Sequence, residues 1–224
     1  MTNLTKNPKG INNFIYAPQA ITNASNHNGS AFINHYRNTH LDNLKNLTIP
    51  TKSKGNENWK YTNLNPIANT NFNHYSELSK TQSIGTDDLK KIIPIDDSWE
   101  RLVFIDGNYC PNLSNLSANQ PDGITFKTIA STVPLEKYLG ESYANKPDVF
   151  TSINSAFLHD GAFIHNKNRQ SPRVIEIVYI STNPSPPTAS HPRTMIIAEP
   201  ESESIILECH ISLAKTTQIT NSVT

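Results

Sequence analysis

The most informative stretch of the sequence reads ENWKYTNL and occupies Glu57–Leu64. It follows a basic segment, and the rings of Trp59 and Tyr61 lie on one face if the backbone here is extended. We therefore expect both rings to anchor this segment onto a domain core, with Leu64 beginning the next buried element. The alternative is a stacking platform for a ligand, which no neighbouring residue supports.

A second informative stretch reads RLVFIDGNY, at Arg101–Tyr109. Its first half is rich in residues that favour strands, and the dipeptide Asp106-Gly107 is typical of a tight hairpin turn. The sequence therefore predicts a β-hairpin. Asp106 could be taken for a catalytic carboxylate, but an aspartate before a glycine in a hairpin usually serves the turn itself.

A third stretch reads INSAFLHDGA, at Ile153–Ala162. It ends a predicted helix over 148–158, which has apolar residues along one side. The residues His159, Asp160 and Gly161 then break the helix. We interpret His159 and His165 as loop and strand-surface residues, because no metal-ligand spacing surrounds them.

Further helices are predicted on either side of these stretches. Apolar residues recur at helical spacing from Ile33 to Leu47, with Ser30 as the N-cap and Pro50 as the end. A short helix over 86–93 is expected to be capped by Thr86. Another is expected over 135–144, near Pro134.

Short strands dominate the rest of the chain. One is predicted over 124–129, and four more over 162–165, 174–181, 194–198 and 204–213, with a proline-rich loop over 183–192. In the last strand, the alternation predicts a buried face and leaves Ile206 as an exception. The members of that buried face are Ile205, Leu207, Cys209, Ile211 and Leu213.

Composition limits the possible functions. The 224 residues carry a net charge of zero, from 19 basic and 19 acidic residues, which argues against bulk-charge binding to nucleic acid or membranes. No apolar run is long enough to span a bilayer, and no secretory signal begins the chain. We therefore expect a cytoplasmic protein.

Local motifs for metals and nucleotides are absent from the sequence. Cys110 and Cys209 match no ligand spacing, and we expect two reduced, buried or half-buried thiols. There is no phosphate-binding loop and no dinucleotide fingerprint. The sequence therefore predicts neither a metal site nor a catalytic site.

The three stretches, in this order, resemble the N-terminal half of the SufB/SufD family, and the SufD branch most closely. The resemblance runs from about Ile33 to the end of the chain. It implies an α+β protein with a small mixed N-terminal α/β domain followed by the first coils of a right-handed parallel β-helix. The expected divisions are a flexible tail over 1–28, the α/β domain over 29–158 and an incomplete β-helix core over 159–224. One departure is the polar segment 166–170, which leaves strand pairing there open.

The resemblance also implies a function. Members of the family are non-catalytic scaffolds of the SUF iron–sulfur cluster assembly complex, in which SufD pairs with a SufB-like paralogue and a SufC-like ATPase. We expect this portion to bind no cofactor, because the cluster is assembled by the full complex, and the family's cluster-related positions have no counterpart here. The signature residues, expected to be structural, are Trp59, Lys60, Tyr61, Asp106, Gly107, Asp160 and Gly161.

The resemblance further implies that the chain stops within the central domain of the family. Terminal coils of a solenoid need a cover, and each exposed Ile or Leu forgoes up to about 1.5–3 kcal/mol. We therefore expect the isolated chain to be marginally stable or prone to aggregate through an open edge.

Two alternatives remain for the function. The first is a binding-only or decayed remnant without cluster-assembly activity. The second is a β-helix enzyme acting on carbohydrate, which would need clustered carboxylates. The acids of the strand region are scattered, and we interpret Glu199, Glu201 and Glu203 as members of a solvated turn.

Overall fold

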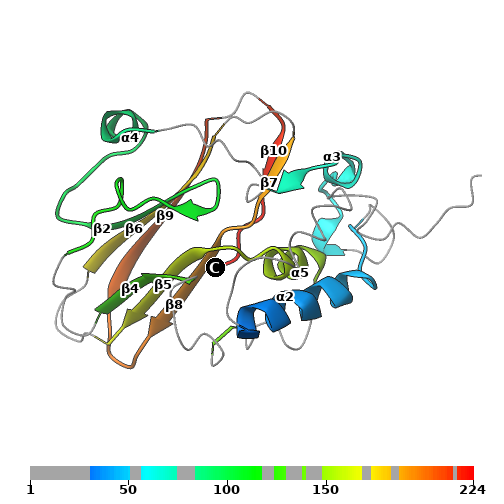
Figure 1. The fold of residues 1–224 in the computed structure, drawn as a ribbon, viewed down its shortest axis with the longest axis horizontal. Helices are drawn as coiled ribbons and strands as arrows, with labels where there is room; N and C mark the ends of the chain where they lie inside the picture. Colours follow the sequence, from blue (N-terminus) through cyan, green and yellow to red (C-terminus); the bar gives the residue numbers. More distant parts are fainter. Residues whose placement is uncertain are drawn as a thin grey trace, which may run out of the picture.

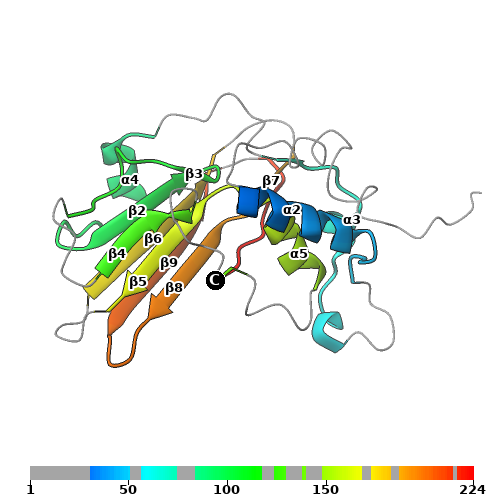
Figure 2. The same cartoon turned by 60° about the horizontal axis from the view of Figure 1, so that its bottom comes forward.

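The computed structural model describes residues 31–50, 57–74, 84–117, 124–129, 138–139, 148–167, 173–182, 187–213 and 216–224. The predicted tail over 1–28 and the cap Ser30 lie outside these residues, as does most of the predicted helix over 135–144. The described chain forms a mixed α/β structure of helices and sheets. Figures 1 and 2 show most of the strands on one side, with helices α2 (Ala31–Leu44), α3 (Asn65–Ala68) and α5 (Val149–Ala156) on the other.

The helices follow the apolar spacing of the sequence. They are α2 (Ala31–Leu44), a short 3₁₀ helix η2 (Glu57–Trp59), α3 (Asn65–Ala68), α4 (Thr86–Ile92) and α5 (Val149–Ala156). The predicted helices that begin near residues 30, 86 and 148 are therefore confirmed. None of the described helices is long and apolar enough to cross a membrane.

Helix α5 shows how the local sequence starts a helix. The Asp148 carboxylate accepts hydrogen bonds from the backbone N–H groups of Phe150 and Thr151, which satisfies two of the donors that a helix leaves free.

The predicted N-cap of α4, Thr86, is wrong by one residue. Thr86 is already helical, and Gly85 precedes the helix with its N–H donated to the Asp88 side chain at 3.2 Å.

The strands form three sheets within the described residues. The four-stranded sheet has the order β3-β2-β6-β9, and two three-stranded sheets have the orders β4-β5-β8 and β1-β7-β10. The bounds are β1 (Asn73–His74), β2 (Glu100–Ile105), β3 (Asn108–Tyr109), β4 (Ile124–Thr128), β5 (Gly161–Asn166), β6 (Arg173–Ser181), β7 (Thr188–Ser190), β8 (Arg193–Ala198), β9 (Ser204–Ser212) and β10 (Gln218–Thr220).

The strands after residue 160 repeat in sets of three. The first set is β5, β6 and β7, and the second is β8, β9 and β10. Each strand of the second set lies parallel to its counterpart in the first, with Gly161 opposite Arg193, Arg173 opposite Ser204 and Thr188 opposite Gln218. Consecutive strands thus fall in different sheets, and the pattern recurs after about 30 residues.

Earlier parts of the chain join these sheets directly. Strand β2 pairs in parallel with β6, β4 pairs antiparallel with β5, and β1 pairs in parallel with β7. The hairpin of β2 and β3 is confirmed, with Phe104 opposite Tyr109. The polar segment 166–170, for which strand pairing was left open, begins at Asn166. This residue is the last of β5 and pairs with both Ile124 and Ala198.

Two strand predictions need correction. The proline-rich loop predicted over 183–192 contains β7, a strand that is too short to be predicted from the alternation of apolar residues. The predicted buried face of β9 is wrong at its beginning, where Ile205 is 50% exposed and Leu207 36% exposed. Ile206, the exception in the alternation, packs against the buried cluster between the sheets.

The core is divided by the sheets into four clusters. The inner cluster lies between the four-stranded sheet and the β4-β5-β8 sheet, and it includes Phe104, Ile164 and Ile177. The outer cluster lies under α4, on the other face of the four-stranded sheet, and includes Val103 and Val178. We call these two faces of the four-stranded sheet its inner face and its outer face.

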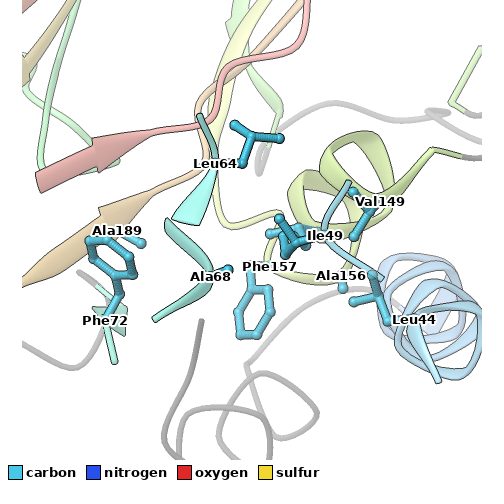
Figure 3. Packing of buried hydrophobic residues seen from close by; sticks show 10 residues of the cluster. Leu44, Ile49, Leu64, Ala68, Phe72, Val149, Ala156, Phe157 and Ala189 are labelled. Atoms are coloured by element: carbon cyan, nitrogen blue, oxygen red, sulfur yellow. The ribbon is translucent and has the colours of Figure 1, made fainter. Parts of the chain in front are cut away.

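The remaining two clusters hold the helices against the strands. One packs Ile33 and Tyr36 of α2 against Phe163 of β5. The other joins α2, α5 and the smallest strands, and Figure 3 shows Leu44 of α2 near Ala156 of α5, with Phe72 beside Ala189. The helices and the strands therefore pack together in shared hydrophobic clusters.

A buried ion pair crosses the outer face between β2 and β6. Arg101 and Glu176 are opposite each other in the register, and the Arg101 Nε donates to a Glu176 carboxylate oxygen. Both side chains are almost completely buried. Because burial removes both charged groups from water, each is stabilised mainly by the opposite charge of its partner.

We expect Arg101→Met to destabilise the protein by about 3–5 kcal/mol, because it leaves the Glu176 carboxylate buried without its partner. The double variant Arg101→Met/Glu176→Leu removes both charges and should recover most of that loss. Urea unfolding of the three proteins measures both effects. Equal destabilisation in the single and double variants would contradict the buried pair.

A second buried titratable group lies at the junction of β7 and β8. His191 is buried, with its ring 5.5 Å from that of Phe157 and its Nδ1 3.4 Å from Nδ2 of Asn221. Burial lowers the pKa of His191 to about 3. Burial, followed by the nearby Arg193 charge, also lowers the pKa of His40.

The folded protein should therefore lose stability as the pH falls from about 6.5 to about 3. In that window the unfolded chain binds a proton at His191 that the folded chain excludes, which favours unfolding by up to about 4 kcal/mol. The measurement is urea unfolding across this pH range for the wild type and His191→Gln. The variant should show a shallower loss, and parallel curves would refute the assignment.

Candidate functional site

The signature residues Trp59, Lys60 and Tyr61 lie at the end of η2, beside the helical layer. The Trp59 ring packs against the cluster that joins α2 and α5, with its centroid 5.0 Å from that of Phe150. Lys60 pairs with Glu57 at 3.4 Å, and its ammonium lies 5.4 Å from the centre of the Tyr61 ring. Trp59 therefore fixes the segment, as predicted.

The same prediction is wrong for Tyr61. The backbone turns here and is not extended, so the two rings do not share a face. Tyr61 is 88% exposed and does not anchor the segment.

Asp106 and Gly107 form the two-residue turn between β2 and β3. Their φ angles are 50° and 80°, which is the left-handed geometry that such hairpin turns require. The prediction of turn chemistry for Asp106 is therefore confirmed.

The structure adds a partner for Asp106 that the sequence did not reveal. The Asp106 carboxylate is buried and accepts hydrogen bonds from the Thr182 backbone N–H, at 2.7 Å, and from the Thr182 hydroxyl. Thr182 follows the end of β6. The carboxylate thus ties the hairpin turn to the end of the neighbouring parallel strand.

Asp160 and Gly161 lie at the start of β5, where the first set of strands begins. The Asp160 carboxylate accepts the Gly161 backbone N–H at 2.8 Å. A Cβ on Gly161 would lie 1.9 Å from the backbone oxygen of Arg193, so no side chain fits. Gly161 is therefore required by the close approach of β8.

Arg193 connects this contact to the helical layer. Its Nε donates to Oδ1 of Asn154 at 2.7 Å, and one of its terminal nitrogens donates to Oγ of Ser155 at 2.9 Å. The Tyr36 hydroxyl of α2 also hydrogen-bonds to Ser155 Oγ, at 3.0 Å. Asn154 Nδ2 donates to the backbone oxygens of Pro192 and Asn221.

This network brings together residues far apart in the sequence, and every one of its side chains is hydrogen-bonded. The sequence signal that could have revealed it is the polar run Asn154-Ser155 on a helix that is otherwise apolar. Such buried polar groups need partners, and the partners come from α2, from Pro192 and Arg193, and from Asn221 after β10.

An aromatic ladder crosses the inner face of the four-stranded sheet. The rings of Tyr109, Phe104, Tyr179 and His210 follow one another across β3, β2, β6 and β9, with centroid separations of 5.7, 5.1 and 5.2 Å. The strand register aligns them, since Phe104 is opposite Tyr179 and Tyr179 is opposite His210. Cross-strand ring pairs of this kind stabilise a sheet.

Polar groups surround the middle and the end of this ladder. The Tyr179 hydroxyl donates to the backbone oxygen of Arg193 at 3.0 Å, and burial raises its pKa. His210 Nε2 lies 2.8 Å from Oε1 of Glu208. Burial raises the pKa of Glu208, but hydrogen bonds from His210, Thr194 and Thr224 outweigh it, and the net pKa is low.

The two thiols are half-buried, as predicted, and both pack on the outer cluster. The Cys110 N–H donates to Val103, which pairs with Val178, which pairs with Cys209. The thiols are therefore three strand spacings apart, about 14 Å. That is too far for a disulfide or for shared ligation of one metal.

The other candidate ligands are also separated. His159 contacts Asn108, whereas His165 contacts Glu199. Among the described residues, no group of three or more His, Cys, Asp or Glu side chains is arranged to hold a metal ion.

Three acids of the strand region lie in different surroundings. Glu176 is buried against Arg101 on the outer face, and Glu208 lies on the inner face. Glu201 occupies a turn with a φ angle of 65°, as predicted for a solvated turn. The described contacts of the signature residues serve packing and turns.

We expect Gly161→Ala to destabilise the protein by several kcal/mol, because its methyl group would overlap the Arg193 carbonyl and separate β5 from β8. Gly85→Ala is the matched control, since the nearest atom to its Cβ would lie at 3.6 Å. Thermal unfolding of both variants measures the difference. A loss in Gly161→Ala no larger than that in the control would contradict the close contact.

One comparison with known proteins identifies a family. The model of the SufBD protein N-terminal region matches residues 12–177, about three quarters of the chain. Its description covers SufB and SufD together. The search of the curated proteins found no match. Because the family model covers more than half of the sequence, the chain belongs to the SufB/SufD family.

Proposed function

We propose that this protein is a non-catalytic scaffold subunit of the SUF iron–sulfur cluster assembly complex, of the SufD branch, to which it contributes an N-terminal portion. The observation that carries the proposal is the match of the family's N-terminal region to residues 12–177. Family membership indicates a role in SUF cluster assembly together with other Suf proteins. The choice of the SufD branch rests on the resemblance of the three sequence stretches in their order.

We further propose that the two sets of strands are the first coils of a right-handed parallel β-helix. In support, each strand of the second set is parallel to its counterpart in the first, in three different sheets. The residues after β10 continue in the same way, because Val223 forms a parallel bridge with Arg193. A stack of this kind has the nearest-neighbour contacts of a solenoid.

In this proposal, residues 29–158 form the α/β domain and residues 159–224 form the start of the coils. The two parts are extensively paired, since β2 extends the β6–β9 sheet and α2 packs on β5. The signature residues then have a structural role. Asp106 ties the domain to the first coil through Thr182, Trp59 packs on Phe150 within the domain, and Gly161 allows the first coil to approach Arg193 of the second.

The iron–sulfur cluster is the cargo of the full complex in this scheme, and this portion binds no cofactor of its own. The proposed partners are a SufB-like paralogue and a SufC-like ATPase, and the proposed location is the cytoplasm. A chain that only binds a partner, without cluster-assembly activity, is the alternative to be tested. The carbohydrate-enzyme alternative has no support from the strand-region acids, because Glu176 and Glu208 lie on opposite faces.

The proposal is tested by tagging the protein at its N-terminus in its source cells and identifying the proteins that co-purify. We expect SufB-like and SufC-like proteins in a defined ratio, because a scaffold subunit works within a stable complex. Deleting the gene should lower the activity of iron–sulfur enzymes, and restoring it should recover that activity.

Each failure of this experiment has a distinct meaning. Co-purification without any change in iron–sulfur enzyme activity would favour the binding-only alternative. The absence of both Suf proteins from the purified material would contradict the proposed function.

A further inference from the structure

Three buried side-chain atoms lack a hydrogen-bond partner among the residues that the structure describes. They are Nδ1 of His40 on α2, Oγ of Ser152 on α5 and Oγ1 of Thr188 on β7. Ser152 is completely buried, so its hydroxyl cannot bond to bulk water. Buried polar atoms nearly always have a partner, which is either a protein group or an ordered small molecule. The atoms on α2 and α5 come from two helices that pack on each other, and they indicate a shared partner.

Helices α2 and α5 run in opposite directions. The Tyr36 hydroxyl, in the first half of α2, hydrogen-bonds to Oγ of Ser155 in the last turn of α5, at 3.0 Å. At the other end, Leu44 of α2 belongs to the same cluster as Val149, the first residue of α5. Figure 1 agrees, since the start of α2 lies beside the end of α5 that leads into β5. A step forward along α2 is therefore matched by a step back along α5.

This geometry places His40 and Ser152 at the same level of the helix interface. His40 follows Tyr36 by one turn, with ring centroids 4.6 Å apart, and Ser152 precedes Ser155 by one turn. Arg193 gives independent evidence that His40 is close to this part of α5. Its guanidinium donates to Oγ of Ser155 at 2.9 Å, and its charge acts on His40.

The size of the side chains leaves room at this level. One turn away, the hydroxyphenyl group of Tyr36 and a 3.0 Å hydrogen bond together span the distance to Ser155. At the level of His40 the residue opposite is again a serine, but an imidazole is shorter than a hydroxyphenyl group. At equal helix spacing, a direct hydrogen bond from His40 would not reach Ser152. The remaining space suits a molecule the size of water, which occupies about 30 Å³ in the liquid.

The charges around this space select a neutral occupant. Burial, followed by the Arg193 charge, lowers the pKa of His40, so the imidazole is neutral and Nδ1 presents a lone pair. That lone pair repels an anion, and the Arg193 charge disfavours a cation. The Ser152 hydroxyl can donate or accept. The occupant must therefore be small and neutral, and it must donate a hydrogen bond to Nδ1.

We propose that one ordered water molecule binds between α2 and α5, where it donates to Nδ1 of His40 and hydrogen-bonds to Oγ of Ser152. The His40 proton is then on Nε2. The water extends the buried network of Arg193, Ser155 and Tyr36 by one level and joins the helices where their facing residues are polar. The proposal is independent of the function in cluster assembly.

The first experiment is a crystal structure of the full chain at a resolution that shows ordered water. We expect one density peak within about 2.7–3.2 Å of both Nδ1 of His40 and Oγ of Ser152. A direct hydrogen bond between these two atoms, or no density between them, would overturn the proposal.

The second experiment follows His40 in solution by nuclear magnetic resonance of the ¹⁵N-labelled full chain. We expect the shifts of a neutral ring that is protonated at Nε2 and accepts a hydrogen bond at Nδ1. Ser152→Ala removes one partner of the water, so the Nδ1 resonance should move toward that of a nitrogen without a hydrogen bond. Ser98→Ala is the matched control, because the Ser98 hydroxyl bonds to Asp96 on an exposed loop, and it should leave the resonance unchanged.

Other solution results would contradict the water site. A proton on Nδ1 would exclude a donor at that atom. An identical Nδ1 resonance in the wild type and in a folded Ser152→Ala variant would remove Ser152 from the site. The wild-type measurements stand on their own if Ser152→Ala does not fold, which circular dichroism checks.

Discussion

The contact between Gly161 and the Arg193 carbonyl is the constraint on which the rest of this structure depends. It brings the first residue of β5 against the first residue of β8, at a distance that no side chain allows. The same arginine extends its side chain to Asn154 and Ser155 of α5. One residue therefore sets where the second set of strands begins and joins that set to the helical layer.

The two faces of the four-stranded sheet are stabilised in different ways. On the inner face, apolar side chains and a ladder of four rings follow the strand register. On the outer face, the Arg101–Glu176 pair is buried in an otherwise apolar cluster. A buried pair of charges contributes little net stability compared with apolar packing, but it strongly disfavours any register that separates the partners. The outer face thus contributes specificity, and both faces contribute apolar burial.

Local chemistry explains which elements could be predicted from the sequence. The Asp106–Gly107 turn and the Asp148 cap depend on neighbouring residues, so their signals are contained in a few positions. The enclosed strand β6 could be recognised because it is apolar on both faces, apart from Glu176. The resemblance of three short stretches identified the family, which the family model then confirmed.

The elements that the sequence did not reveal depend on distant partners. Strand β7 has only three residues and is defined by its neighbours β1 and β10, which no local pattern contains. Tyr61 has the composition of an anchor, but the turn at η2 directs it to solvent. The partners of Asp106 and Arg193 are 76 and 39 residues away, so their hydrogen bonds could be found only in the folded chain. The alternation in β9 correctly separated two faces, but it could not show how much of each face would be covered.

The strands after residue 160 form two parallel sets, stacked in register. Backbone nuclear Overhauser contacts in the isotopically labelled chain test this most directly. We expect contacts between Ala162 and Thr194, and between Val178 and Cys209, with the pattern of parallel strands throughout β5–β8 and β6–β9. An antiparallel pattern between these strands, or the absence of these contacts in the folded protein, would contradict the stacked arrangement.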